Sequence, residues 1–323
     1  MRPAFSVLFL TTLAGAGQGL FLALFTQQSY ALVGQLPMQD EAFYGYGTVV
    51  ALLFLAGGLL GSFFHLGHPE RAWRAASQWR TSWLSREVIV LPAFMGVVFL
   101  YGAAHLMHWK PVLVTLPNGL ALDASVVLGC IGTLLAFALF VCTAMIYACL
   151  RMMREWHSPL TVANYILMGT GSGFLLAAAY AAFTAPSQAR FFALWAFIIT
   201  ALAMISRVAS LWRNARLRPV TTLQSATGIK HPRVVQKSQG AMGGSYNTHE
   251  FFHGKSAAFI RAIKPSFLAL AFGVPLLLLA AAPAVAAILA PAFAIQYAGL
   301  LAERWYFFAE VNHPQNIYYQ TIG

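Results

Sequence analysis

Charged side chains are scarce in this sequence. They make up 9% of its 323 residues, and only 9 residues are acidic, against 20 that are Lys or Arg. Soluble domains carry about 25% charged residues, and a chain that is 59% hydrophobic has more apolar surface than one water-soluble core can bury. The composition therefore excludes a soluble enzyme, a nucleic-acid-binding protein and a disordered protein. It indicates an integral membrane protein.

Cysteine is also scarce, and long polar stretches are almost missing. The three cysteines, Cys130, Cys142 and Cys149, lie in one apolar segment, which provides neither a disulfide framework nor a CxxC metal site. We interpret them as buried structural thiols. The longest polar stretch is residues 213–262, so we expect no separate soluble domain.

Long apolar segments are abundant. A helix needs about 20 apolar residues to cross the hydrocarbon core of a membrane, and eight segments meet this requirement: residues 5–33, 44–66, 87–109, 123–150, 160–183, 188–212, 263–282 and 284–309. The sequence predicts an all-α integral membrane protein, a bundle of about eight transmembrane helices that forms one anchor domain over residues 1–323. Glycines recur inside the first, second and fifth segments, and we expect them to let helix backbones approach closely.

The basic residues predict the orientation. Lys110 and Arg190 lie in the odd-numbered connections, and the other eighteen of the 20 basic residues lie near the termini or around the even-numbered connections. Positively charged loops stay in the cytoplasm, so both termini and the even-numbered connections are predicted to be cytoplasmic. Residues 213–262 then form a long basic cytoplasmic loop. Its histidines, His231, His249 and His253, lack the close spacing of a metal site.

The densest group of candidate functional residues surrounds the connection between the second and third helices, from His65 to Glu87. Ionisable groups are costly at membrane depth and are therefore functional candidates. We expect His65, in the last turn of the second helix, and Glu87, at the start of the third, to face one pocket at the cytoplasmic edge. Arg71 and Arg86 would lie close enough to influence their protonation.

These residue types suit a quinone. A quinone headgroup needs hydrogen-bond donors at two carbonyl oxygens and a route for two protons, inside an apolar slot that accepts its tail. Histidine exchanges a proton near neutral pH, and a glutamate such as Glu87 can pass one on. The same spacing also fits a capped helix junction, in which His65 satisfies a carbonyl and Glu87 favours the helix N-terminus. From spacing alone, both interpretations stand.

The segments His65–Ala72 and Ser82–Glu87 resemble the signature of the dimethyl sulfoxide reductase anchor subunit family, approximately HLGxPxRA followed by SxLSxE. The helix count, the Gly-Gln-Gly sequence at residues 17–19 and an Arg-x-x-Phe pattern near the end are similar as well. The resemblance implies a subunit without metal or haem that anchors an iron–sulfur subunit and a molybdopterin catalytic subunit and exchanges electrons with quinone. By position it implies these quinone-site residues: His65, Gly67, Arg71, Ser85 and Glu87.

Within this family, the chain is most similar to the anchors of cytoplasm-facing sulfite dehydrogenases. The loop after the sixth helix is long and basic, the charge asymmetry places the His65 edge in the cytoplasm, and the ending Ala302–Glu310 followed by His313–Asn316 is similar to that branch. The resemblance implies electron flow from sulfite, through the partners' molybdenum and iron–sulfur clusters, into menaquinone or ubiquinone in the bacterial inner membrane. This subunit would not perform the molybdenum chemistry, would carry the quinone-reactive site, and would not pump protons. A dimethyl sulfoxide reductase-type anchor that oxidises quinol is the alternative.

Further residues are expected at the same cytoplasmic edge: Arg86, Tyr147, Arg151, His157 and Arg304. Each of these residue types also occurs at membrane interfaces without a site role. A purely structural anchor without a quinone site is therefore another interpretation, and it would keep quinone-linked turnover after His65 is replaced.

Two other function classes stay open. A haem-b subunit would use His105 or His108 near the outer end of the third helix, but helix rise separates them from His65 by about 30 Å. Both fit better as interfacial residues that cap the helix end. A transporter would need charged residues at the midplane and broken helices in matched halves. Here the ionisable residues lie near the ends of the spans, and Pro275, Pro283 and Pro291 interrupt the last two spans.

Overall fold

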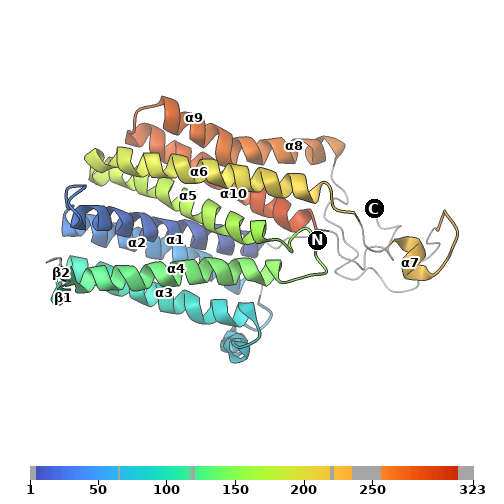
Figure 1. Ribbon diagram of the computed structural model, residues 1–323, viewed down its shortest axis with the longest axis horizontal. Coiled ribbons are helices and arrows are strands. Elements are labelled where there is room, and N and C mark those ends of the chain that lie inside the picture. Colours follow the sequence, from blue (N-terminus) through green and yellow to red (C-terminus); the bar gives the residue numbers. More distant parts are fainter. Residues whose placement is uncertain are drawn as a thin grey trace.

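The structure is a computed structural model that describes residues 5–64, 66–115, 117, 121–218, 222–234 and 256–311. Within these ranges, eight helical segments are long and apolar enough to cross a membrane, and they lie side by side in one bundle (Figure 1). The first seven are α1 (Phe5–Leu32), α2 (Glu41–Phe63), α3 (Trp83–Leu106), α4 (Ala124–Ala148), α5 (Pro159–Thr184), α6 (Pro186–Asn214) and a composite span (Ala257–Ala281); α10 (Ala286–Ala309) is the eighth. The predicted membrane bundle is confirmed.

The smaller elements lie in the connections and in the composite span. The composite span consists of α8 (Ala257–Leu268), a short π-helical segment η3 (Ala269–Gly273) and α9 (Val274–Ala281). The connections hold a 3₁₀ helix η1 (Pro69–Gln78), a short helix α7 (Leu223–Thr227) and two antiparallel strands, β1 (Val112–Thr115) and β2 (Ala121–Asp123). The strands and α7 were not predicted, because short segments carry little periodicity.

Helix α3 begins at Trp83 rather than at the predicted residue 87. Ser82 is its N-cap, and its side chain accepts a hydrogen bond from the Ser85 amide at 3.4 Å. A serine oxygen at this position satisfies an amide that has no partner within the helix. Glu87 therefore lies one turn inside α3 instead of opening it. Helix α2 ends at Phe63. His65, which was predicted to lie in the last turn of this helix, is outside the described residues.

Close packing of α1 against α5 depends on glycine. A Cβ atom on Gly173 would overlap the backbone of Gly19, and one on Gly15 would lie 3.3 Å from the Gly169 Cα. The absence of side chains lets the two backbones touch, as small residues do in membrane bundles. The expected role of these glycines in helix approach is confirmed for α1 and α5.

Replacing Gly173 with valine should therefore disrupt the bundle. Overpacking a tight core costs about 3 kcal/mol, and here the obstacle is backbone that cannot rotate away. We expect a lower unfolding temperature and less folded protein in detergent, measured by intrinsic fluorescence and gel filtration. Gly96→Val is the control, because, within the described residues, a Cβ at Gly96 would meet no neighbouring helix within 4 Å. Equal unfolding temperatures for the two variants would contradict this packing role.

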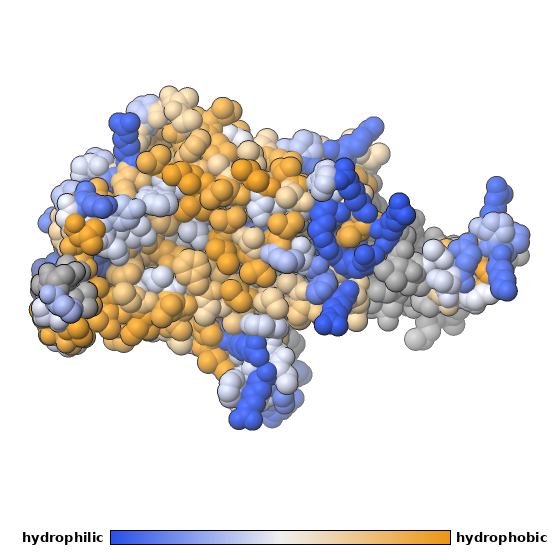
Figure 2. Space-filling model, viewed as in Figure 1, coloured by the Kyte–Doolittle hydropathy of each residue, from blue (hydrophilic) through white to orange (hydrophobic). Residues whose placement is uncertain are grey.

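The two ends of the bundle differ in charge. We call the end where α1 begins the basic end, because it carries exposed arginines around η1, between α4 and α5, and after α6. Figure 2 shows hydrophilic side chains gathered there, with a hydrophobic surface over the middle of the bundle. The opposite end carries the strands β1 and β2. Part of the long polar loop, including His249 and His253, lies outside the described residues, whereas His231 is exposed.

The cysteine prediction holds for one thiol. Cys142 is buried, but Cys130 and Cys149 are exposed on the bundle. The prediction of three buried thiols is therefore wrong. In a membrane bundle, an apolar helix face can point outward because the surrounding lipid is itself apolar.

Candidate functional site

The structure separates the residues that the sequence grouped around the α2–α3 connection. Ser85 and Glu87 are buried on α3. Gly67 and Arg71 are exposed, and the Arg71 Nε lies 3.7 Å from a carboxylate oxygen of the neighbouring Glu70. His65 lies outside the described residues. The buried acid therefore lies on α3, while two of the predicted site residues stay on the surface of the connection.

Arg86 stabilises the connection. Its Nε donates to the Trp79 carbonyl at 2.9 Å and its Nη2 to the Arg80 carbonyl at 2.8 Å. The guanidinium also lies 4.2 Å from the ring centroid of Trp83. These bonds tie the guanidinium to the end of the α2–α3 connection, a contact that the sequence did not predict.

Glu87 lines a cavity inside the bundle, between α1, α3, α4, α5 and α10. The Thr143 hydroxyl of α4 donates to the Glu87 carboxylate at 2.5 Å. The other polar residues that line the cavity include Gln18 of α1, Tyr165 of α5 and Arg304 of α10. The cavity volume is about 40 Å³, which is space for a few water molecules.

Several polar atoms on the cavity walls are unsatisfied. The Gln18 Oε1, the Tyr165 hydroxyl and the Arg304 Nη1 are buried and have no hydrogen-bond partner in the described part of the chain. Each of these three side chains is more than nine-tenths buried. Buried polar atoms in native proteins are nearly always paired with protein, water or ligand. The cavity is therefore built to hold a polar molecule.

Arg304 is fixed by its neighbours. Its Nε donates to the Glu303 carboxylate at 2.7 Å, and its guanidinium lies 4.1 Å from the ring centroid of Tyr165. The Nη2 approaches the Met168 sulfur at 3.9 Å, a weak contact. The guanidinium thus keeps donor capacity for a ligand in the cavity.

A second arginine shares the same carboxylate. The Arg207 Nε of α6 lies 2.7 Å from the other oxygen of Glu303, and the two side chains are 1% and 0% exposed. Glu303 therefore bridges two buried guanidinium groups. From the sequence, Arg207 was one of the basic residues that predict the orientation, and Glu303 was not among the predicted site residues. Their position inside apolar helices was the available signal, because ionisable groups there are rare and functional.

The remaining predicted edge residues do not line the cavity. Tyr147 stacks on Tyr165 with ring centroids 5.9 Å apart, in an aromatic cluster behind the cavity wall. Arg151 is exposed. His157 is exposed, and its Nδ1 lies 2.6 Å from the Ala148 carbonyl, which closes the α4–α5 connection. Among the five weaker candidates, Arg304 is the one that lines the cavity.

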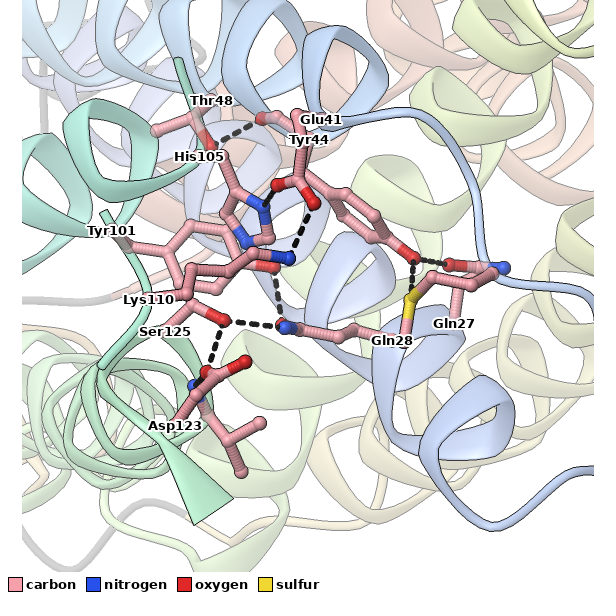
Figure 3. A network of polar contacts seen from close by, with 12 residues as sticks. Gln27, Gln28, Glu41, Tyr44, Thr48, Tyr101, His105, Lys110, Asp123 and Ser125 are labelled. Atoms are coloured by element: carbon pink, nitrogen blue, oxygen red, sulfur yellow. Dashed lines mark hydrogen bonds and ion pairs between the residues drawn. The ribbon is translucent and has the colours of Figure 1, made fainter. Parts of the chain in front are cut away.

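A separate polar network lies at the opposite end of the bundle (Figure 3). The His105 Nδ1 lies 2.6 Å from the Glu41 carboxylate, which also pairs with Lys110. The His105 ring is packed against Tyr44 and Tyr101, with both centroid distances 4.6 Å. His105 is completely buried in the last turn of α3, so its side chain faces the neighbouring helices, which the sequence did not predict. A last-turn residue can face inward when neighbouring helices extend past it.

Gln28 extends this network toward α4. It donates to the Ser125 hydroxyl at 2.7 Å and accepts from the Tyr101 hydroxyl at 2.7 Å. The cavity and this network are separated by apolar packing, because the fully buried rings of Phe21 and Phe94 meet between them with centroids 5.5 Å apart. Along α3, Glu87 and His105 are about 27 Å apart.

Comparison with known proteins identifies relatives. Residues 1–233 match the model of a protein family described as DMSO reductase anchor subunit (DmsC). The chain is also similar to a protein of Allochromatium vinosum that is named as a sulfite dehydrogenase subunit. The two are 54% identical over 325 residues, which cover 100% of each chain.

Proposed function

The chain belongs to the family of DMSO reductase anchor subunits, and on that premise we propose that it passes electrons from an iron–sulfur subunit to quinone. The relative named as a sulfite dehydrogenase subunit supports sulfite, oxidised by a molybdopterin subunit, as the electron source. As the membrane anchor of such a complex, this chain leaves the molybdenum chemistry to its partner. Its own contribution is the site at which the membrane substrate is reduced.

The main support for a quinone site is that two buried donors without hydrogen-bond partners among the described residues, the Tyr165 hydroxyl and the Arg304 Nη1, line the same cavity as Glu87. Reduction of a quinone adds two electrons and two protons and places negative charge on its carbonyl oxygens. The Arg304 N–H groups donate to one carbonyl oxygen and stabilise that charge. The Tyr165 hydroxyl is a second donor, and the Glu87 carboxyl transfers a proton within the same cavity.

The cavity must enlarge to admit a quinone ring, because its volume of about 40 Å³ holds only water. Met168, which lines it beside Arg304, is flexible and adapts its shape easily. His65, predicted at the end of the same connection as Glu87, remains a candidate for relaying protons to the site. The two protons are taken up and the two electrons arrive from the same end of the bundle.

We assign the basic end to the cytoplasm of a bacterial inner membrane, with the partner subunits docked there. The positive-inside rule supports this orientation. The buried rings of Phe21 and Phe94 pack against each other between the cavity and the opposite end, which supports proton uptake from the cytoplasm without pumping. The described part of the long basic loop, which includes α7, lies on the same side (Figure 1).

Purification of the intact complex from its native host tests this function. We expect two larger partner subunits, stoichiometric molybdenum and iron, and quinone reduction that depends on sulfite. A complex that instead oxidises quinol with dimethyl sulfoxide would support the reductase-type alternative. A chain that purifies alone, without metal and without quinone-linked activity, would contradict the proposal.

A further inference from the structure

The 3₁₀ helix η1 has two chemically distinct edges. A 3₁₀ helix has three residues per turn, so residues three apart in sequence lie on one edge. Arg71 and Arg74 share one edge, and Arg80 continues it. Trp73 lies on the adjacent edge, which Trp79 continues as the helical C-cap residue with φ −59° and ψ −24°. The segment is thus basic along one edge and aromatic along the next.

Both edges are accessible. No residue of η1 is buried, and Trp73 and Trp79 are 71% and 53% exposed. The Arg74 guanidinium lies 5.6 Å from the Trp73 ring centroid, and that of Arg80 lies 5.4 Å from the Trp79 ring centroid. Arg74 and Arg80 therefore each lie beside the tryptophan that precedes them in sequence, and both arginine side chains are exposed.

The segment lies across the bundle axis. Figure 1 shows η1 end-on, as the light-blue coil below the basic end of α3, whereas the membrane-spanning helices run horizontally. Figure 2 shows it projecting sideways from the hydrophobic flank of the bundle. The helices that it joins end at Phe63 and begin at Trp83. Because the apolar spans end at this level, we expect a segment that runs parallel to the membrane plane here to lie in the headgroup layer.

We propose that η1 together with Trp79 and Arg80 forms a binding site for the headgroups of anionic phospholipids. Guanidinium groups bond phosphate oxygens in pairs, and Arg74 and Arg80 supply two of them. Tryptophan is enriched at the headgroup level of membranes, which suits Trp73 and Trp79. The site projects sideways into lipid, away from the bundle end on which a protein partner would dock.

Arg86 is excluded from this lipid site by its contacts. Its guanidinium donates to the carbonyls of Trp79 and Arg80, so it fixes the end of the segment. These hydrogen bonds hold Trp79 and Arg80 in place. Arg86 therefore has a structural role, whereas Arg74 and Arg80 bind lipid.

Fluorescence quenching of the intact complex in nanodiscs tests the site. Nanodiscs of phosphatidylcholine would contain either brominated phosphatidylglycerol or brominated phosphatidylcholine, and bromine quenches nearby tryptophan. We expect stronger quenching by the anionic lipid. In Arg74→Gln/Arg80→Gln this preference should fall about fivefold for each arginine removed, and in Trp73→Phe/Trp79→Phe the excess quenching should disappear.

The control is Arg190→Gln/Arg233→Gln, which removes the same charge from exposed arginines elsewhere and should keep the preference. Gel filtration and unfolding temperature establish that each variant is folded. An unchanged lipid preference in Arg74→Gln/Arg80→Gln would overturn the proposal. So would a variant that keeps the preference but releases a partner subunit, because the surface would then bind protein.

Discussion

Glu87→Gln should lower sulfite-dependent quinone reduction about 100-fold, as expected when a proton-transfer group is removed. Glutamine has the same shape and still accepts the hydrogen bond from Thr143, so the bundle should keep its structure. Electron transfer from sulfite to a soluble artificial acceptor should be unchanged, because that acceptor takes electrons from the partner subunits. The measurement is the ratio of the two activities in the purified complex.

Glu70→Gln is the matched control for this experiment. Glu70 lies in the connection that precedes α3, but its side chain is 63% exposed, so both activities should be kept. His65→Ala separates the quinone site from a purely structural anchor, because only the former predicts a loss of quinone reduction. If Glu87→Gln reduces quinone at the wild-type rate, the cavity is not the site of proton transfer.

Glu303→Gln should destabilise the protein by about 3–5 kcal/mol, the cost of removing one partner from a buried ion pair. The carboxylate is 0% exposed; it accepts a hydrogen bond from the Arg304 Nε and forms an ion pair with the Arg207 Nε, each at 2.7 Å. Without it, Arg207 and Arg304 are left as like charges inside the bundle. The unfolding temperature in detergent, followed by intrinsic fluorescence, should fall well below that of the wild type.

A double variant isolates the electrostatic cause. Arg207→Met/Glu303→Gln leaves one unpaired guanidinium instead of two, so it should unfold at a higher temperature than Glu303→Gln alone. This non-additivity is the signature of directly coupled residues. Glu70→Gln, whose side chain is 63% exposed, is the control for loss of an acid outside the bundle interior. Equal unfolding temperatures for the single and double variants would exclude the bridge.

The Glu303 bridge also bears on the quinone site. One carboxylate oxygen holds the Arg304 Nε, which fixes the plane of the guanidinium and leaves Nη1 for the cavity. The other oxygen pairs with Arg207, which ties α10 to α6. The arginine that we assign to the quinone carbonyl is thus held by a carboxylate outside the cavity lining.

The number and the approximate positions of the eight spans were predictable from sequence. A helix must have about 20 apolar residues to cross the membrane, and the length of an apolar segment can be read directly from the sequence. Boundaries were less accurate where a cap determined them. Ser82 moved the start of α3 toward the N-terminus, and Glu87 moved inside the helix as a result. The sequence also identified Glu87 and Arg304 as ionisable residues near one edge of the bundle.

What the sequence determined by itself is the class of the protein, its number of spans and its charge asymmetry, since each follows from composition along the chain. Only the tertiary structure decided that Glu87 of α3 and Arg304 of α10 line one cavity, that Glu303 joins two arginines, and that His105 faces inward. These contacts depend on how each helix is rotated against its neighbours. That rotation is fixed by side-chain packing between distant segments, such as Gly19 against Gly173, which no local pattern records.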